Sequence, residues 1–482
     1  MKNQTFNPYL PSYEYVPDVE PRVFDGRVYV YGSHDRFNAP IFCVQDYVCY
    51  SCPVEDLSDW RYEGIIYKKT SDPKNRLGLR LLFAPDVVQG TDGKYYLYYS
   101  FDFMGLIGVA CSDSPAGIFK FLGYVHYSGG DLFGRRKGDP FPFDPAVLVD
   151  DDGKIYLYSG FYIDIPRVVT GGKKLKSNGG VVIELESDML TIKCNPKLIF
   201  PKTGEGSFKD HEFFEASSIR KAGGLYYFVY SSRHNHELCY AVSNRPDGDF
   251  EFKGTLVSIG DVFRNGNIDE KKALNYLGNT HGGLLNLHDK WYIFYHRQTN
   301  RHSYSRQSCA EELKVNSDGD FMQAEVTSCG LNGGSLKGYG RYPSYIVCNL
   351  WSKYGCGRYD CRNPRRVFRK HPYLTQKGHG IPPREEEYIA NIRDGSVAGF
   401  KYFDMQKVSR ITVEVRGKGH GQIIVSEDKS FGVENSVIPV DLKNKKEYLE
   451  FSSHMMIEDG TKSLYFKYTG QGYIDFKSFT IE

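Results

Sequence analysis

The chain has 482 residues, which suggests several domains or one large β domain joined to a smaller one. The formal net charge is only +2, so the composition gives no case for nucleic acid or an anionic membrane surface as a partner. Tyr and Phe, with 38 and 31 copies, together with 50 Gly, favour many short strands joined by turns over a helical fold. No run of apolar residues approaches the roughly 20 that span a bilayer.

The N-terminus and the cysteines bear on the compartment. Residues 1–8 have no apolar core of the kind that a secretory signal needs. The 11 cysteines are odd in number and scattered, so reduced thiols are expected. The sequence therefore predicts a cytoplasmic protein, or a secreted one if a leader was removed from the chain.

Two cysteine clusters are candidates for zinc, and neither matches a zinc pattern well. One is the pair Cys49 and Cys52, and the other comprises Cys348, Cys356 and Cys361, with His371 further on. Ordinary thiols are the simpler interpretation of both clusters.

One sequence pattern recurs five times between residues 15 and 297. Each copy has a polar residue at its head, a short apolar run, a turn, and a strand rich in aromatic and β-branched residues. An Asp-Gly dipeptide, a strong hairpin signal, marks the turn in each of the first three copies. The heads, in chain order, are Asp18, Asp86, Asp144, Glu215 and His281.

The period of the repeat predicts the fold. Roughly 60–70 residues per copy leave room for four strands and their loops, and five such units close in a ring with only short sheet edges. The fold class is therefore all-β: a five-bladed β-propeller over residues 1–335 and, after a linker at 336–384, a small β-sandwich over 385–482. Polar–apolar alternation in the last segment indicates half-buried strands. One short helical turn is expected near residues 269–274.

The heads of equivalent propeller strands converge at one end of the axis. Grouped carboxylates are costly unless a site uses them, and their repulsion raises at least one pKa, as a general acid requires. Because two carboxylates flanking a sugar hydrolyse glycosidic bonds, Asp18, Asp144 and Glu215 are predicted to form a glycosidase active site. Asp86 is expected to bind substrate or to cap a strand. His281 is either a core histidine or a residue that holds an ion or water on the axis.

At these residues the chain resembles glycoside hydrolase family 43, five-bladed propeller enzymes that act with inversion on arabinose- and xylose-containing polysaccharides. The resemblance covers about residues 7–330. Asp18, after Val16-Pro17, is similar to the family's general base, and Glu215 is similar to its general acid. Asp144, before Pro145, is similar to the Asp that tunes the pKa of the acid.

The fifth copy extends the resemblance. His281, followed by two glycines, resembles the family's fifth-blade histidine, and His296-Arg297 resembles its closing basic pair. The resemblance implies that Asp86, His281 and Arg297 contribute to substrate binding. It also implies that His281 helps to hold a structural calcium ion, while hydrolysis itself requires no cofactor.

The chain departs from the family pattern at two positions. Val19 follows Asp18 where the family often has Pro, which leaves Glu20 as a rival for the base. Ala216-Ser217 follows Glu215 where Gly-Pro or a similar pair is frequent. The tail from residue 385 resembles a family 6 carbohydrate-binding module, which implies either a sugar binder or a packing partner.

The resemblance implies an inverting hydrolase of the α-L-arabinofuranosidase or β-xylosidase type, whose partner is an oligosaccharide. The alternatives are an exo-galactanase or arabinanase of the same fold, or a non-catalytic propeller that binds sugar. The long segments 34–83 and 161–212 favour a closed pocket and hence exo action. Oligomeric state is not visible in the sequence.

Overall fold

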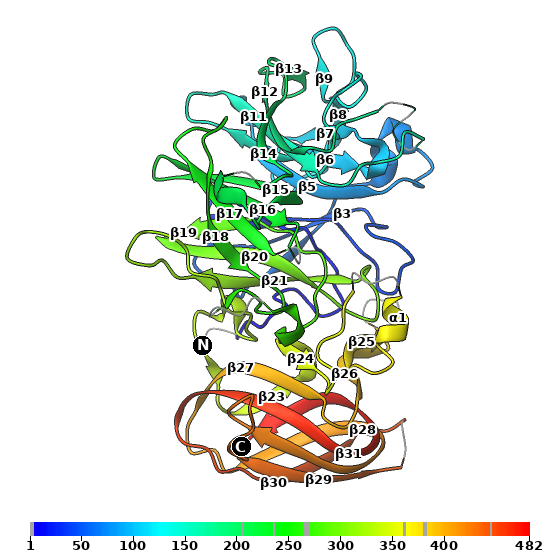
Figure 1. The fold of residues 1–482 in the computed structure, drawn as a ribbon, viewed down its shortest axis with the longest axis vertical. Coiled ribbons are helices and arrows are strands. Elements are labelled where there is room, and N and C mark those ends of the chain that lie inside the picture. Colours follow the sequence, from blue (N-terminus) through cyan, green and yellow to red (C-terminus); the bar gives the residue numbers. More distant parts are fainter. Residues whose placement is uncertain are drawn as a thin grey trace.

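The computed structural model describes residues 4–168, 170, 172, 174–204, 206–234, 237–264, 269–359, 363–378, 383–443 and 446–482. A ring of five β-sheets lies above a β-sandwich formed by the last part of the chain (Figure 1). The predicted all-β fold with a five-bladed propeller is confirmed. Over the described ranges, no helix has the length and apolar character needed to cross a membrane.

The first two blades are four-stranded antiparallel sheets in which chain order is also spatial order. The first blade comprises β1 (Glu20–Phe24), β2 (Arg27–Tyr31), β3 (Tyr47–Pro53) and β4 (Arg61–Tyr67). The second comprises β5 (Leu82–Gln89), β6 (Tyr95–Phe101), β7 (Ile107–Ser112) and β8 (Lys120–Tyr124). The 3-10 turns η1 (Lys69–Ser71) and η2 (Pro73–Asn75) connect the two blades, and η3 (Asp102–Met104) follows β6.

The remaining blades differ in strand number. The third comprises β9 (His126–Tyr127), β10 (Ala146–Val149), β11 (Ile155–Phe161), β12 (Gly179–Leu185), β13 (Thr191–Ile192) and β14 (Lys197–Pro201). After η4 (Gly206–Phe208), the fourth comprises β15 (Phe213–Ala222), β16 (Leu225–Ser232), β17 (Leu238–Ser243) and β18 (Glu251–Val257). The fifth comprises β19 (Leu284–Leu287), β20 (Lys290–Gln298) and β21 (Arg306–Leu313). The expected helical turn is present as η6 (Glu270–Lys272).

Residues before β1 close the ring against the fifth blade. The side-chain amide of Asn7 donates to the carbonyl of Ala310 at 3.0 Å and to the Glu311 carboxylate at 2.8 Å. A parallel bridge between Val19 and Gly282 joins the first and fifth blades beside the axis. These contacts bring the start of the chain, including residue 18, next to the fifth blade.

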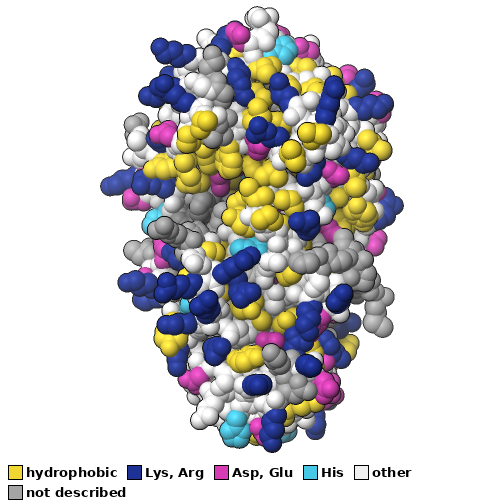
Figure 2. Space-filling view, turned by 90° about the vertical axis from the view of Figure 1, so that its right-hand side faces the viewer, with side chains coloured by type: hydrophobic (Ala, Val, Ile, Leu, Met, Phe, Trp, Pro, Cys, Tyr) yellow, Lys and Arg dark blue, Asp and Glu magenta, His cyan; other side chains and the backbone are white. Residues whose placement is uncertain are grey.

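Aromatic side chains fill the wedges between blades, which accounts for their abundance. Phe200 of the third blade stacks on Phe228 of the fourth with ring centroids 4.0 Å apart. Tyr98 of the second blade donates its hydroxyl to the Met189 carbonyl of the third at 2.7 Å. Buried tyrosines need a partner for the hydroxyl, and the neighbouring blade supplies it. Figure 2 shows hydrophobic side chains gathered on the propeller half of one face.

The predicted linker is wrong, because residues 336–377 contribute strands to the sandwich sheet. These are β22 (Leu336–Lys337), β23 (Gly340–Pro343), β24 (Asn349–Trp351) and β25 (Tyr373–Lys377). They pair with β26 (Glu385–Ile392), β27 (Val397–Met405) and β31 (Gly460–Ile481), while β28 (Arg410–Ser426), β29 (Ser436–Leu442) and β30 (Leu449–His454) complete the sheet. The sequence pattern missed them because strands of two to five residues are too short to show an alternation of polar and apolar residues. The turn η7 (Gly330–Asn332) precedes β22, and the turn η8 (Ser344–Ile346) and the helix α1 (Pro364–Val367) lie between the later strands.

Candidate active site

One backbone conformation recurs near the start of the inner strand in each of the first four blades. Asp18, Ala84, Asp144 and Ala216 all have positive φ, at 58°, 38°, 45° and 68°. This left-handed conformation is uncommon outside glycine, and such residues cluster at functional sites. Its recurrence identifies the structurally equivalent head of each blade, which is Ala84 in the second blade and Ala216, one residue after the predicted Glu215, in the fourth.

The sequence register was therefore wrong by two residues in the second blade. Strand pairing sets Asp86 opposite Tyr98 and Glu20 opposite Tyr31, so Asp86 is equivalent to Glu20. Two residues along a strand amount to about 7 Å, which places Asp86 deeper along the axis than Asp18. Its carboxylate is fully buried and pairs with Arg22 at 2.5 Å. Asp86 does not line the cavity described below, so its buried ion pair stabilises the fold and its carboxylate does not bind substrate.

Glu20 has the same kind of position in the first blade. Its carboxylate pairs with Arg220 at 2.7 Å and accepts a hydrogen bond from Ser218 at 2.9 Å. The Glu20–Arg220 and Asp86–Arg22 pairs form a layer of buried ion pairs beneath the strand heads. Glu20 is outside the cavity lining, which removes it as a rival for the base.

A cavity of about 300 Å³ lies at the strand heads. Four of the five predicted heads reach it, namely Asp18, Asp144, Glu215 and His281. Its apolar wall is made of phenylalanines and one isoleucine: Phe42, Phe83, Phe103, Phe143, Phe161, Ile163 and Phe214. An apolar pocket with a few convergent polar groups is the usual form of a small-ligand site.

Asp18 is held as a carboxylate. Arg306 donates to it from Nη1 at 2.8 Å, and its own backbone N–H donates to Nδ1 of His296 at 3.3 Å. Burial, the largest single influence, would raise the pKa of Asp18, but the Arg306 guanidinium, the neighbouring histidines and a hydrogen bond from Ser33 together bring the pKa below its ordinary value. Burial and Arg306 lower the pKa of His296 to about 3, so its ring is neutral and its Nε2–H donates to the Asn279 carbonyl at 2.9 Å.

Glu215 has the opposite electrostatic environment. Removal from bulk water raises the pKa of its carboxyl, the Asp144 carboxylate raises it further, and the result is about 8. Burial likewise raises the pKa of Asp144 to about 6, and the backbone N–H of Ala216 donates to its Oδ2 at 3.0 Å. At neutral pH the cavity therefore contains a protonated carboxyl at Glu215 and a carboxylate at Asp18. This is the pairing that general acid–base catalysis needs.

His281 lies between two layers of carboxylates. Its Nδ1 is 3.6 Å from Asp144, and its Nε2 is 3.8 Å from Glu20. Burial alone would lower the pKa of His281, but the nearby carboxylates of Glu20, Asp144 and Asp18 raise it to about 9. A protonated imidazole has no lone pair for a cation, so an ion coordinated by His281 would have to displace this proton.

Arg297 is displaced from the position that the sequence predicted. Its guanidinium is buried between the propeller and the following segment, where it donates to the carbonyls of Tyr345 at 2.7 Å and Val347 at 2.8 Å. It does not line the cavity. Successive side chains of a strand point to opposite faces, so Arg297 points away from the face that His296 occupies in β20. Arg297 therefore anchors the sandwich to the propeller.

Arg306 is the principal functional residue that the sequence did not reveal. It contacts Asp18 and also pairs with the buried Asp35 at 2.8 Å, while its guanidinium lies 4.7 Å from the ring centroid of Phe42. It begins β21, the third strand of the fifth blade, so it is not at the head of an inner strand. The repeat pattern offers no signal for it.

The cysteine clusters are not brought together as ligands. Cys49 and Cys52 lie three residues apart on β3 and pack into different core clusters. Cys361 lies outside the described residues. The ten cysteines that are described are free thiols. Within the described ranges, the His, Cys and acidic side chains close enough to share a metal ion are instead His211, Glu237 and Cys239.

Comparisons with known proteins agree with this geometry. The family model for glycosyl hydrolases family 43 matches residues 15–321. A xylosidase/arabinosidase of Thermoclostridium stercorarium is 46% identical, over 100% of this chain and 99% of the relative. A xylosidase/arabinosidase of Bacteroides ovatus is 28% identical over 66% of this chain and 97% of the relative.

Solved structures extend the comparison to both domains. The family 43 arabinoxylan arabinofuranohydrolase of Bacillus subtilis, solved with cellotetraose, has a TM-score of 0.51 at 20% identity and covers 98% of this chain and 97% of that chain. A β-xylosidase/α-arabinofuranosidase from a compost metagenome, solved with xylotriose, has a TM-score of 0.51 at 27% identity and covers 67% of this chain and 98% of that chain. The propeller, its cavity of paired carboxyls and these matches together make the chain a glycoside hydrolase that belongs to glycosyl hydrolases family 43.

Proposed function

We propose that the enzyme is an inverting, exo-acting glycoside hydrolase that releases arabinose or xylose from oligosaccharides. The observation that carries the proposal is the contrast of two carboxyls in one cavity, Glu215 with a pKa of about 8 and Asp18 with a lowered pKa. Asp18 removes a proton from a water on one face of the anomeric carbon. Glu215 protonates the leaving oxygen on the other face, which completes a single displacement.

Asp144 and His281 support this division of roles. The charge of Asp144 keeps the proton on Glu215 until the leaving oxygen takes it. The protonated His281 offsets part of the negative charge of Asp144 and Glu20. The phenylalanine wall excludes water and packs against the apolar face of the sugar.

The substrate class follows from relatives and from the size of the cavity. Two relatives that align over nearly their whole length are named xylosidase/arabinosidase. A cavity of about 300 Å³ suits one terminal sugar and part of the next better than the middle of a long chain. This favours exo action. The C-terminal sandwich is proposed to be a carbohydrate-binding module, in accord with its resemblance to family 6 modules.

The decisive experiment is hydrolysis of p-nitrophenyl α-L-arabinofuranoside, β-D-xyloside and β-D-galactoside, with proton NMR of the first sugar released. Cleavage of the arabinoside or xyloside with an inverted anomeric centre is expected. Cleavage of the galactoside alone would contradict this proposal and indicate an exo-galactanase. A product of retained configuration would remove Asp18 as the base, because retention needs a nucleophile in its place.

The pH profile of the enzyme reports the proton on Glu215. Activity requires this proton. Activity is therefore present below the pKa of about 8 and is lost as pH rises through that value. Asp144→Asn removes the charge that raises this pKa, so the alkaline limb of kcat/KM is expected to move down by on the order of one pH unit. Asp152→Asn, on an exposed turn of the same blade, is the matched control. An alkaline limb that stays in place in Asp144→Asn would contradict the assignment of Asp144.

Calcium is the remaining cofactor to test, since one solved relative is described as a calcium-free form. A calcium ion at the axis would compete with the proton that Glu20 and Asp144 hold on His281. The proposed acid and base need no metal, so EDTA is expected to leave kcat within about twofold. Loss of activity on chelation, with recovery on adding calcium, would show that an ion takes the place of this proton.

A further inference from the structure

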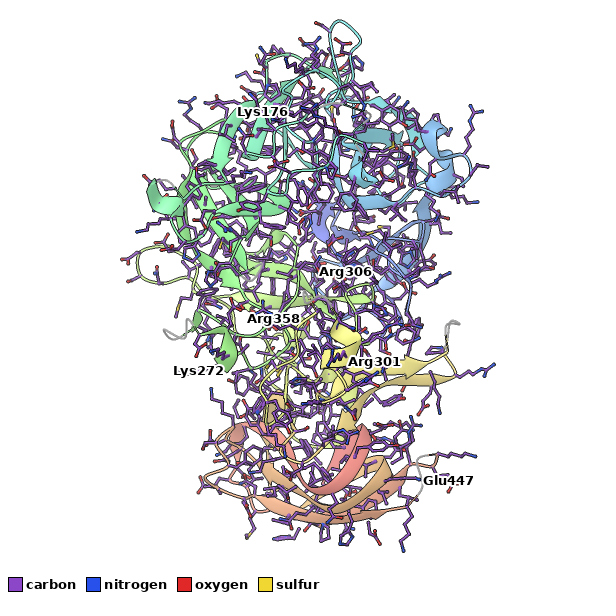
Figure 3. The ribbon with its side chains drawn as sticks, turned by 45° about the vertical axis from the view of Figure 1, so that its right-hand side comes forward. Lys176, Lys272, Arg301, Arg306, Arg358 and Glu447 are labelled. Carbon is purple, nitrogen blue, oxygen red and sulfur yellow. The ribbon has the colours of Figure 1, made fainter. Side chains whose placement is uncertain are left out.

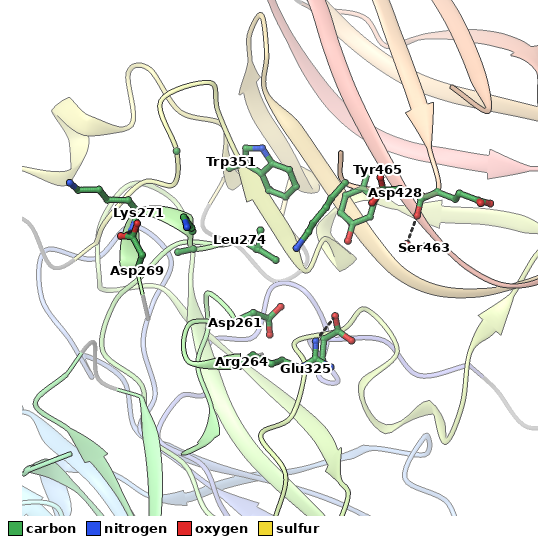
Figure 4. A pocket seen from close by; sticks show the side chains of 15 residues that line it. Asp261, Arg264, Asp269, Lys271, Leu274, Glu325, Trp351, Asp428, Ser463 and Tyr465 are labelled. Atoms are coloured by element: carbon green, nitrogen blue, oxygen red, sulfur yellow. Dashed lines mark hydrogen bonds and ion pairs between the residues drawn. The ribbon is translucent and has the colours of Figure 1, made fainter. Parts of the chain in front are cut away.

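A large cleft separates the propeller from the sandwich. It has a volume of about 980 Å³, against about 300 Å³ for the catalytic cavity. Asp261, Arg264 and Asp269 line it from the propeller, and Trp351 and Tyr465 line it from the sandwich (Figure 4). A cleft of this size holds several sugar units rather than one.

The aromatic wall of the cleft is suited to carbohydrate. The chain has three tryptophans. Trp60 packs on Tyr9 at 4.8 Å between ring centroids, and Trp291 packs on Tyr227 at 5.0 Å. All three are partly exposed, and Trp351 is the one that lines the cleft, with its ring 6.1 Å from that of Tyr465. A partly exposed indole presents a flat apolar face on which a sugar ring packs.

The charges of the cleft favour a neutral polyol. Carboxylates and cations both line it, so a polymer with charges of one sign would meet like charges on the wall. Lys401, which is buried, holds Asp261 at 3.4 Å and Glu325 at 3.0 Å. These carboxylates are thereby fixed in position, and such preorganised acceptors suit sugar hydroxyls.

A second cavity, called the groove below, adjoins the cleft. This cavity has a volume of about 500 Å³ and shares Asp269, Lys271 and Gly355 with the cleft. The lining of that cavity includes Leu277, and Asn279, two residues later, lines the catalytic cavity. Figure 3 shows Lys272 and Arg358 between the propeller and the sandwich, with Arg306 of the active site further into the propeller.

The exposed Tyr354 supplies a second aromatic ring along this path. It lines the groove and is 63% exposed. It follows Trp351 by three residues, across the turn that ends β24. The two rings therefore lie on adjoining cavities, Trp351 in the cleft and Tyr354 nearer to the propeller segment that leads to Asn279.

From this arrangement we propose that the cleft and the groove form a binding track for the neutral backbone of a longer pentose-containing polysaccharide, whose terminal or side-chain sugar enters the catalytic cavity. The proposal rests on the proposed function for the identity of the sugar. It assigns Trp351 and Tyr354 as specificity-determining residues for chain length, remote from the bond that is cleaved. It also gives the sandwich a direct part in holding substrate.

The test compares long and short substrates in Trp351→Ala and Tyr354→Ala. KM for arabinoxylan is expected to rise about five- to tenfold in each variant, while kcat stays within about twofold, because these contacts act on binding alone. For p-nitrophenyl α-L-arabinofuranoside or β-D-xyloside, both constants should match those of the wild type. Tyr62→Ala, at an exposed tyrosine of the outer strand β4, is the matched control.

Two outcomes separate the track from the proposed function. If the aryl glycoside is cleaved and KM for arabinoxylan is unchanged in both variants, the track is overturned and the proposed function stands. If the wild type cleaves none of the aryl glycosides, arabinoxylan binding is measured by calorimetry in Glu215→Gln with and without Trp351→Ala. Binding that Trp351→Ala weakens supports the track independently of hydrolysis, and equal binding rejects it. Because Tyr354 is exposed, its variant keeps the test valid even if Trp351→Ala fails to fold.

Discussion

Glu215→Gln is expected to lower kcat on unsubstituted xylo- or arabino-oligosaccharides by about 10³-fold or more, since a general acid contributes roughly 10²–10⁴-fold. The amide keeps the shape of the side chain but has no acidic proton for the leaving oxygen. On p-nitrophenyl glycosides the loss should be at the low end of that range, because p-nitrophenolate leaves without protonation. Steady-state kinetics on both substrate types measures this difference.

Glu212→Gln provides the control for Glu215→Gln. Glu212 lies three residues earlier on the same segment and does not line the cavity. Its replacement is expected to leave kcat within about twofold, as for a surface substitution away from the site. An equal loss on natural and aryl substrates in Glu215→Gln would argue against its role as the acid, because only proton donation depends on the leaving group.

Asp18→Asn is expected to lower kcat by about 10³-fold on every substrate, whatever the leaving group, because the water then has no base. The low pKa that Arg306 imposes on Asp18 also means that the acidic limb of the wild-type profile lies below the ordinary range for Asp. As pH falls through that pKa, Asp18 takes up a proton and activity is lost. Stopped assays from strongly acidic to mildly alkaline pH, with arabinoside and xyloside, measure both effects.

Asp35→Asn separates the two roles that Asp18 has in the structure. Asp35 is fully buried and pairs with Arg306 at 2.8 Å, as Asp18 does. If Asp18 served only to hold Arg306, the two variants would lose activity equally. If Asp18 is the base, the loss in Asp18→Asn exceeds that in Asp35→Asn by at least about tenfold. Circular dichroism and thermal melting check that both variants are folded, since each removes one partner of a buried ion pair.

The features that could be predicted from the sequence are local and repeated. Turn dipeptides such as Asp25-Gly26 and the strands that follow them recur at a nearly constant interval, and each blade is built from neighbouring residues. Equivalent positions in a ring of blades must converge on its axis. For this reason the repeat pattern alone is sufficient to place Asp18, Asp144, Glu215 and His281 in one site.

The errors arose where register or short strands mattered. A shift of two residues keeps Asp86 on the same strand face but moves it into the layer of ion pairs with Arg22. No turn signal distinguishes Asp86 from Ala84 as the head of the second blade, because both residues precede the same Asp-Gly turn. The strands between residues 336 and 377 were missed because they gain their hydrogen bonds from β26, β27 and β31, which are distant in sequence.

The sequence by itself determined the all-β class, the number of blades and three of the carboxyls in the cavity, since these depend on periodicity and turn chemistry. Only the tertiary structure decided which carboxyl carries the proton. That choice depends on Arg306 beside Asp18 and on Asp144 near Glu215, contacts between residues up to 288 positions apart. Electrostatic energies depend on distance and burial in space, and neither can be obtained from the order of residues along the chain.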